Sequence, residues 1–204
     1  MSQTEGSTAQ HEVPLPPGSH IADPAPLGLA AFALTTFVLS CVNAGFVPDT
    51  VEPVVFGLAL AYGGLAQLVA GIWEFAKGNT FGSTAFTSYA AFWLSFWWLT
   101  GHTDLSGAGA DVTKGVGLYL LAWTIFTAYM TIAASQTNMV LLLVFALLTL
   151  TFLLLTFGEF ATSESLTKLG GYVGLATAFG AWYASFAGVA AFTFGRQVVP
   201  VGAR

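Results

Sequence analysis

From Gly115 to Gly158 the chain carries no formally charged side chain, and this uncharged run limits its fold more than any other feature. The remaining charges are confined to short breakpoints, which separate further uncharged runs at 24–48, 53–73, 78–103 and 169–195. A charge at the centre of a bilayer costs about 2.5–3.5 kcal/mol on insertion scales, so segments that lie in lipid exclude charges. The pattern therefore predicts a chain that crosses a bilayer several times.

Length and composition limit the number of crossings. Only 7% of the residues are charged, whereas soluble domains carry about 25%, so charge cannot cover a globular surface. The 204 residues allow roughly six spans of about 20 residues and leave no room for a separate soluble domain. The longest run exceeds one span, and the polar tetrapeptide 135–138 divides it. We expect an all-α integral membrane protein, a six-transmembrane-helix bundle with helices near 27–47, 53–76, 81–101, 115–134, 139–158 and 169–194.

The segments outside the bundle are polar. Residues 1–22 are Pro-rich, without a basic region followed by an apolar one, and read as a disordered tail instead of a signal peptide. The transmembrane domain is expected at 23–196, with a short C-terminal tail at 197–204. An even number of spans places both termini on one side. That side carries three basic residues against two opposite, so the positive-inside rule favours cytoplasmic termini in a multi-pass protein of the plasma (inner) membrane.

Several kinds of chemistry have no residues to support them. No basic patch exists to hold nucleic acid, and neither a phosphate-binding GxxxxGK[ST] run nor a GxSxG nucleophile elbow occurs. The three histidines, His11, His20 and His102, fall in expected tails or loops, so no histidine metal site is expected inside the membrane. We expect neither an enzyme nor a cofactor.

Uncharged polar side chains do occur deep in three expected spans. The first span contains Thr35, and the second contains Tyr62 and Gln67. The third is the richest, and at 3.6 residues per turn four of its hydroxyls fall close to one stripe, namely Thr80, Thr84, Thr87 and Ser88. Such a stripe can replace the water around a small polar solute. Alternatively, each hydroxyl bonds the carbonyl four residues earlier in its own helix.

Two expected helix starts could attract an anion without a formal positive charge. Pro24 precedes Leu27 and Gly28 at the first, and Asn79 precedes the third span. The free N–H groups of a helix N-terminus favour negative charge. This matters because no Lys or Arg lies within an expected span.

Longer motifs resemble a known family. Residues 23–29 (DPAPLGL) are similar to the NPAPLGL signature of the acetate uptake transporters, also called the succinate–acetate permease family. Further likeness is carried by 62–67 (YGGLAQ), 77–82 (KGNTFG), 84–89 (TAFTSY) and 92–94 (FWL), and by 194–196 with 199–202 at the C-terminal end. The resemblance extends from about residue 23 to residue 202.

The resemblance implies more than the residues alone predict. It implies six helices per protomer, a homo-oligomer that is a ring of six protomers, and a path through each protomer for acetate and, in some members, succinate. It also implies a narrow apolar gate, which by motif consists of Phe32, Tyr89 and Leu148. Ala181 matches a family position that affects substrate size. Two residues depart from the family pattern, because Asp23 replaces the usual Asn and Glu159 stands where bacterial members tend to have a neutral residue.

The resulting hypothesis is a membrane channel or transporter for small monocarboxylates, with lipid around it. Acetate would enter at the two helix starts, pass Gln67 and the hydroxyl stripe, and cross the gate. Glu74 and Glu159 are candidate proton sites, although both also read as solvated charges at helix ends. Whether the path is a channel or a proton-coupled carrier stays open. A non-transporting scaffold or sensor is the alternative, and it predicts hydroxyls that face neighbouring helices with no continuous path.

Overall fold

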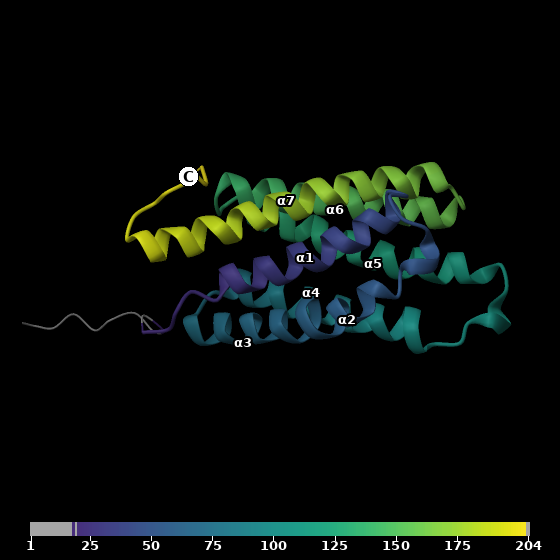
Figure 1. Ribbon diagram of the computed structural model, residues 1–204, viewed down its shortest axis with the longest axis horizontal. Helices are drawn as coiled ribbons and strands as arrows, with labels where there is room; N and C mark the ends of the chain where they lie inside the picture. The colour runs from purple at the N-terminus through teal and green to yellow at the C-terminus, as the bar shows by residue number, and fades with distance from the viewer. Residues whose placement is uncertain (1–17, 19, 203–204) are drawn as a thin grey trace, which may run out of the picture.

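The computed structural model describes residues 18 and 20–202, and over that range every regular element is helical (Figure 1). Six long helical segments follow one another along the chain. They are α1 (Ala25–Asn43); a composite of α2 (Val54–Leu60), η2 (Ala61–Ala66) and α3 (Gln67–Lys77); α4 (Thr80–His102); α5 (Asp111–Ala134); α6 (Met139–Phe160); and α7 (Glu164–Phe194). Two short 3₁₀ turns, η1 (Asp49–Val51) and η3 (Ser106–Ala108), lie in the connections. The predicted number of helices is confirmed.

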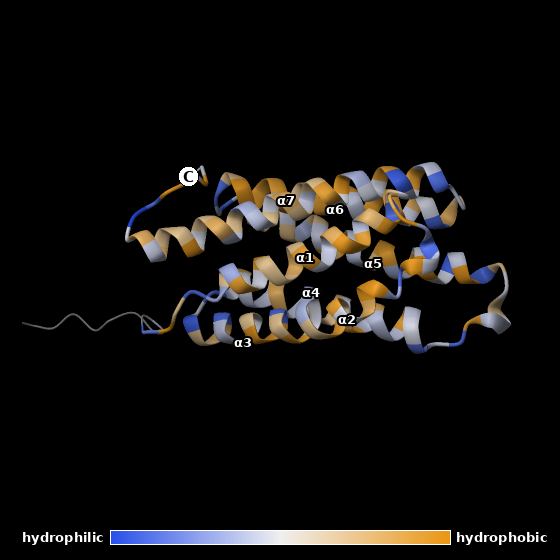
Figure 2. Ribbon diagram, viewed as in Figure 1, coloured by the Kyte–Doolittle hydropathy of each residue, from blue (hydrophilic) through white to orange (hydrophobic). Residues whose placement is uncertain are grey.

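Five of the six segments are long and apolar enough to cross a membrane, among the residues that the structure describes. The exception is α4, which has 23 residues but whose Ser, Thr, Tyr and Trp side chains lower its mean hydropathy. Figure 2 shows apolar residues along the length of the bundle and polar ones mostly near its ends. The described part of the chain is thus an all-helical membrane protein.

Helix bounds differ from the expected ones where backbone conformation intervenes. The first helix ends at Asn43 instead of 47, because Gly45 adopts a positive φ of 77° that an α-helix cannot continue through. The second span is interrupted by the π-helix η2, which was not predicted. Gly63 and Gly64 lie in this π-helix, and a Cβ on Gly64 would lie 2.6 Å from both the Ala59 carbonyl oxygen and Leu94 Cδ2. The close approach of α4 therefore requires glycine there.

Small residues bring the helices into close contact. The most extensive contact joins α1 to α7, followed by α6 to α7 and α5 to α6. Gly171 of α7 packs directly on the backbone of Asn43 and Ala44, and Gly174 packs on the Ser40 side chain. Without a hydrophobic driving force between helices in lipid, such close backbone approach supplies much of the attraction.

Both ends of the described chain lie at one end of the bundle, as an even number of spans requires (Figure 1). Residues 197–202, expected as a short tail, pack back on the bundle: the Met139 N–H donates to the Gly202 carbonyl at 3.0 Å, and the Tyr183 hydroxyl donates to the Pro200 carbonyl at 2.7 Å. Most of the expected N-terminal tail, with His11, and Arg204 lie outside the described residues. Helices α1, α4 and α6 all begin at this end, so they run in parallel.

Candidate functional site

A small cavity lies where the three parallel helices α1, α4 and α6 meet α3. Its volume is about 20 Å³, and it is lined by Leu29, Phe32, Gln67, Ala85, Phe86, Tyr89, Val144, Phe145 and Leu148. A cavity of this size holds roughly one water molecule and is too small for a carboxylic acid. We call it the constriction.

Helical periodicity places the side chains of the constriction. Leu29 and Phe32 are one turn apart on α1, and α4 and α6 each add the residues three and four positions before Tyr89 and Leu148. The Phe32 and Tyr89 rings lie 5.8 Å apart, and the Tyr89 and Phe145 rings lie 6.1 Å apart. The Tyr89 hydroxyl donates to Thr127 Oγ1 of α5 at 3.1 Å. This bond holds the phenol ring in place and leaves its apolar face toward the cavity.

Gln67 is the polar residue of the constriction. Its side chain has no exposed surface, and neither its amide nitrogen nor its amide oxygen has a hydrogen-bond partner. A buried polar group without a partner costs about 1–3 kcal/mol, and such groups in native structures call for an explanation. The amide can donate to a carboxylate that enters the cavity.

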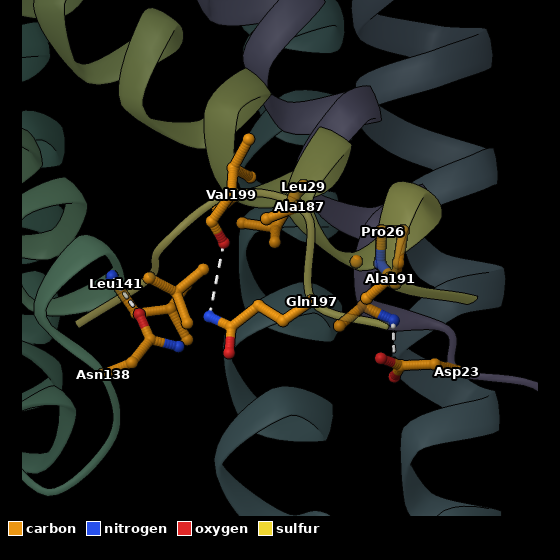
Figure 3. Close-up of a pocket in the computed structure, with 13 residues that line it drawn as sticks. Asp23, Pro26, Leu29, Asn138, Leu141, Ala187, Ala191, Gln197 and Val199 are labelled. Carbon is orange, nitrogen blue, oxygen red and sulfur yellow. Dashed lines mark hydrogen bonds between the residues drawn. The ribbon is translucent and has the colours of Figure 1, made fainter. Parts of the chain in front are cut away.

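A wider pocket opens at the end of the bundle that holds the termini, and we call it the mouth (Figure 3). Its volume is about 350 Å³, and it shares Leu29 with the constriction. Asp23, Asn138 and Gln197 are its polar lining residues. The Asp23 carboxylate forms an ion pair with Lys77 at 2.6 Å, so the charge that departs from the family signature is neutralised by a neighbour.

A second wide pocket, which we call the vestibule, lies at the opposite end. Its volume is about 620 Å³, and Leu39, Asn43, Phe96, Leu155 and Glu159 are among its lining residues. An adjoining pocket of about 750 Å³ shares Asn43 and Glu159 with it. From Leu29 to Asn43 the α1 backbone rises about 21 Å at 1.5 Å per residue, so the three spaces follow one another along the bundle.

The vestibule has two features that bear on a solute: a pair of aromatic rings and a group of acidic side chains. The Phe92 and Phe152 rings both line the vestibule and meet edge to face at 5.2 Å, about one helical turn beyond Tyr89 and Leu148 of the constriction. Glu52, outside the spans, also lines the vestibule, and its pKa is raised by burial, then by the nearby charges of Asp49 and Glu159. The vestibule is therefore acidic, unlike the mouth.

The structure brings the three predicted gate residues, Phe32, Tyr89 and Leu148, together with Gln67 around one cavity. Other predicted path residues lie in helix contacts instead. Gly28 packs on the Phe86 ring, and the Thr35 hydroxyl donates to the Ala31 carbonyl at 2.9 Å. The remaining ones line none of the mouth, the constriction or the vestibule: Pro24, Leu27, Tyr62 and Ala181.

The predicted hydroxyl stripe also lies away from the three spaces. Thr84 and Ser88 each precede a constriction residue by one position, so they point about 100° away from it at 3.6 residues per turn. Thr80 is exposed, and the Thr87 hydroxyl donates to the Ser83 carbonyl at 2.5 Å while packing on Gly71. For Thr87 the alternative of a bond within its own helix is the correct one.

The expected free N–H groups at the third span are partly occupied. Asn79 caps α4, because its Oδ1 accepts from the Gly82 N–H at 3.0 Å. Its amide nitrogen donates to Glu74 Oε2 at 2.9 Å, and Glu74 Oε1 has no partner. The reading of Glu74 as a solvated end charge is wrong, since the residue has no exposed surface. Glu159 is half-buried and lines the vestibule and its adjoining pocket.

Five constriction residues were not predicted from the sequence. They precede the gate residues by three or four positions on the same helices: Leu29, Ala85, Phe86, Val144 and Phe145. The i, i+3, i+4 rule applied backward from the three gate residues would have found them.

Comparisons with known proteins show which family the chain belongs to. A family model, the GPR1/FUN34/yaaH family, matches residues 6–201. Acetate permease A of Emericella nidulans is 43% identical, and the match covers 88% of this chain and 65% of the permease. The succinate-acetate/proton symporter SatP of Escherichia coli K12 is 37% identical, with 89% of this chain and 96% of the symporter covered.

A solved structure is also similar. The structure of the bacterial acetate channel SatP matches with a TM-score of 0.82 and 37% identity, and covers 89% of this chain and 99% of that one. The chain spans 64–68% of the length of three similar yeast and fungal relatives.

Proposed function

The chain belongs to the GPR1/FUN34/yaaH family, whose members include acetate and succinate permeases and channels, and we propose that it passes acetate and other small monocarboxylates through each protomer. The observation that carries the proposal is the unpaired, buried amide of Gln67 in a constriction between the mouth and the vestibule. No enzymatic role is proposed.

The passage has three steps. Acetate, with a pKa of roughly 4–5 like side-chain carboxyls, is mainly anionic at neutral pH and gathers in the mouth near the start of α1. The rings of Phe32 and Tyr89 move apart with Leu148 to admit it, and the Gln67 amide replaces part of its lost hydration. It then passes Phe92 and Phe152 into the vestibule. The passage also runs in reverse, since no step fixes a direction.

The remaining predicted residues act indirectly in this proposal. Pro24, Leu27 and Gly28 shape the start of α1, and Asn79 and Thr80 shape the start of α4. The rest affect passage through the packing of the helices that carry the constriction: Thr35, Tyr62, Thr84, Thr87, Ser88 and Ala181.

Assembly and orientation follow from the family resemblance and from charge. We propose a ring of six protomers, which native mass spectrometry of the detergent-solubilised protein can count. The termini face the cytoplasm, supported by Arg196 at their end of the bundle; the three lysines of the described chain, Lys77 at that end and Lys114 and Lys168 at the other, are each paired with an acidic neighbour. In right-side-out vesicles, protease access to the C-terminus, or labelling of a cysteine introduced there, tests this orientation.

Uptake of labelled acetate into proteoliposomes tests the function. We expect saturable flux above that of empty liposomes, whereas a scaffold or sensor gives none. An imposed proton gradient separates a channel, which equilibrates acetate, from a coupled carrier, which accumulates it. Glu74→Gln and Glu159→Gln then show which carboxyl, if either, couples the proton.

The gate makes a further prediction for the same assay. Replacing Phe32, Tyr89 and Leu148 together by Ala widens the constriction, so succinate flux should rise relative to acetate flux. Unchanged selectivity in vesicles that hold equal amounts of the folded variant would contradict the assignment of these three residues.

A further inference from the structure

The constriction is followed, one helical turn toward the vestibule, by a second layer on the same four helical segments. Four residues farther along α1, α4 and α6 from Phe32, Tyr89 and Leu148 stand Thr36, Trp93 and Phe152. The second span runs in the opposite direction, so its matching residue is Gly63, four before Gln67. Residues four apart on a helix share a face. We call Thr36, Gly63, Trp93 and Phe152 the second layer.

Thr36 is unusual among the buried threonines. Its side chain is 6% exposed, and its hydroxyl has no hydrogen-bond partner. The other six buried threonines of the described chain all have one, usually the carbonyl four residues earlier: Thr35, Thr124, Thr127, Thr151, Thr156 and Thr177. The missing bond at Thr36 leaves a donor free in the interior.

Trp93 supplies a second free donor. It is 1% exposed, and its indole N–H also lacks a partner. A Cβ on Gly63 would lie 2.7 Å from Trp93 Cδ1, the carbon bonded to that nitrogen, and 2.8 Å from Thr35 Oγ1. The Cδ1 edge of the indole and Thr35 of α1 therefore both lie against Gly63, and Thr36 is the next residue along α1.

We propose that Thr36 and Trp93 form a second binding station for the carboxylate group, one turn beyond the constriction. The inference rests on the proposed function and adds a site to it. Both donors are neutral, and together with Gln67 they are three of the four residues in the described chain with buried, unpaired side-chain polar atoms. Phe152, in the same layer, meets the Phe92 ring at 5.2 Å at the vestibule.

The station shortens the distance that the carboxylate travels without a hydrogen-bond donor. A carboxylate that leaves the Gln67 amide finds new donors about 6 Å farther along the bundle, at four residues of 1.5 Å rise. Hydrogen bonds to a charged acceptor are roughly twice as strong as those between neutral groups. A hydroxyl and an indole N–H thus favour the anion over a neutral solute of the same size.

The test is labelled-acetate flux in proteoliposomes with three threonine variants. Thr36→Val keeps the shape and removes the hydroxyl, and we expect acetate flux at subsaturating concentration to fall about tenfold, the effect of one lost bond to a charged group. Thr36→Ser keeps the hydroxyl and stays within about twofold of the wild type. Thr177→Val, at a buried threonine whose hydroxyl bonds the Val173 carbonyl of α7 and Thr151 of α6, is the matched control and also stays near the wild type.

A second measurement separates a binding role from a packing role. Thr36→Val should lower the flux of acetamide, the neutral analogue of acetate, far less than the flux of acetate. Trp93→Phe should likewise lower acetate flux far more than acetamide flux. Equal flux of Thr36→Val and Thr177→Val, or equal losses for acetate and acetamide, would overturn the station. Absence of acetate flux in the wild-type vesicles would instead overturn the proposed function, and the station with it.

Discussion

Replacing Gln67 by Met is expected to make the protein more stable and less active at the same time. The side chain has no exposed surface, both polar atoms of its amide lack partners, and the residue lines a cavity of about 20 Å³. Methionine has a similar length and flexibility but no strong hydrogen-bonding group. The exchange therefore removes unpaired groups while keeping the constriction filled.

The magnitudes follow from the contacts. Each unpaired buried group costs about 1–3 kcal/mol, and the cavity has room for about one water that can pair part of the amide. We therefore expect Gln67→Met to raise the free energy of unfolding by about 1–3 kcal/mol. A hydrogen bond to a charged carboxylate is worth about 1.5–3 kcal/mol, so acetate flux should fall roughly tenfold to a hundredfold.

Two assays on the same preparation check the expected gain in stability and the expected loss of activity. Thermal unfolding in detergent gives the stability change, and acetate flux in proteoliposomes gives the activity. Leu65→Met on the same span, at a side chain that is 52% exposed on the outer surface, is the matched control and should change neither. A variant that is less stable than the wild type, or that transports acetate as fast, would refute the reasoning.

Three further predictions concern packing, capping and pH. Gly171→Ala places a Cβ on the α1 backbone and should destabilise the protein by about 1–3 kcal/mol, measured as the midpoint of thermal unfolding, whereas Gly57→Ala meets nothing within 4 Å and should not lower it. Asn79→Ala removes a helix cap, worth about 1 kcal/mol, and also the partner of a buried carboxylate, so it should cost more than Asn138→Ala, which removes a cap alone. Burial raises the pKa of Glu52 in the folded state, so folding favours its protonated form and stability is lost as pH rises through that pKa. Glu52→Gln should therefore raise the unfolding midpoint at pH 8 and leave it nearly unchanged at pH 4. A larger rise at pH 4 than at pH 8 would contradict a raised pKa of Glu52.

The positions of the spans could be predicted because the penalty for charge in lipid acts on each residue separately. The break at 135–138 between α5 and α6 is an example, since it needs no knowledge of neighbouring helices. The π-helix η2 could not be predicted in this way. It depends on how closely α4 approaches Gly63 and Gly64, which is a property of the packed bundle.

The candidate site likewise combines features that single residues predict with features that only the packed bundle decides. Gln67 was predicted as a polar residue at depth, but its unpaired amide is visible only in the packed structure. The gate residues came from resemblance to a family, and the structure places them around one cavity. The prediction that the hydroxyl stripe on α4 lines the path was wrong. By residue type, either Ser88 or Tyr89 could line a path for acetate, and only tertiary packing decides which of two adjacent residues faces the constriction.

Under the proposed function, a constriction without charge allows one passage to be both selective and fast. An arginine or lysine there would hold a carboxylate strongly, and a site that binds too tightly does not conduct. In the proposed passage the anion meets an amide, and in the inferred second layer a hydroxyl and an indole N–H, while Phe32, Tyr89 and Leu148 are proposed to limit its size. Each neutral donor compensates only part of the lost hydration, so the anion is released to the next one. Selectivity then depends on the width of the gate, and rate depends on the spacing of donors, which is why variants of the gate and variants of the donors are expected to change different measured quantities.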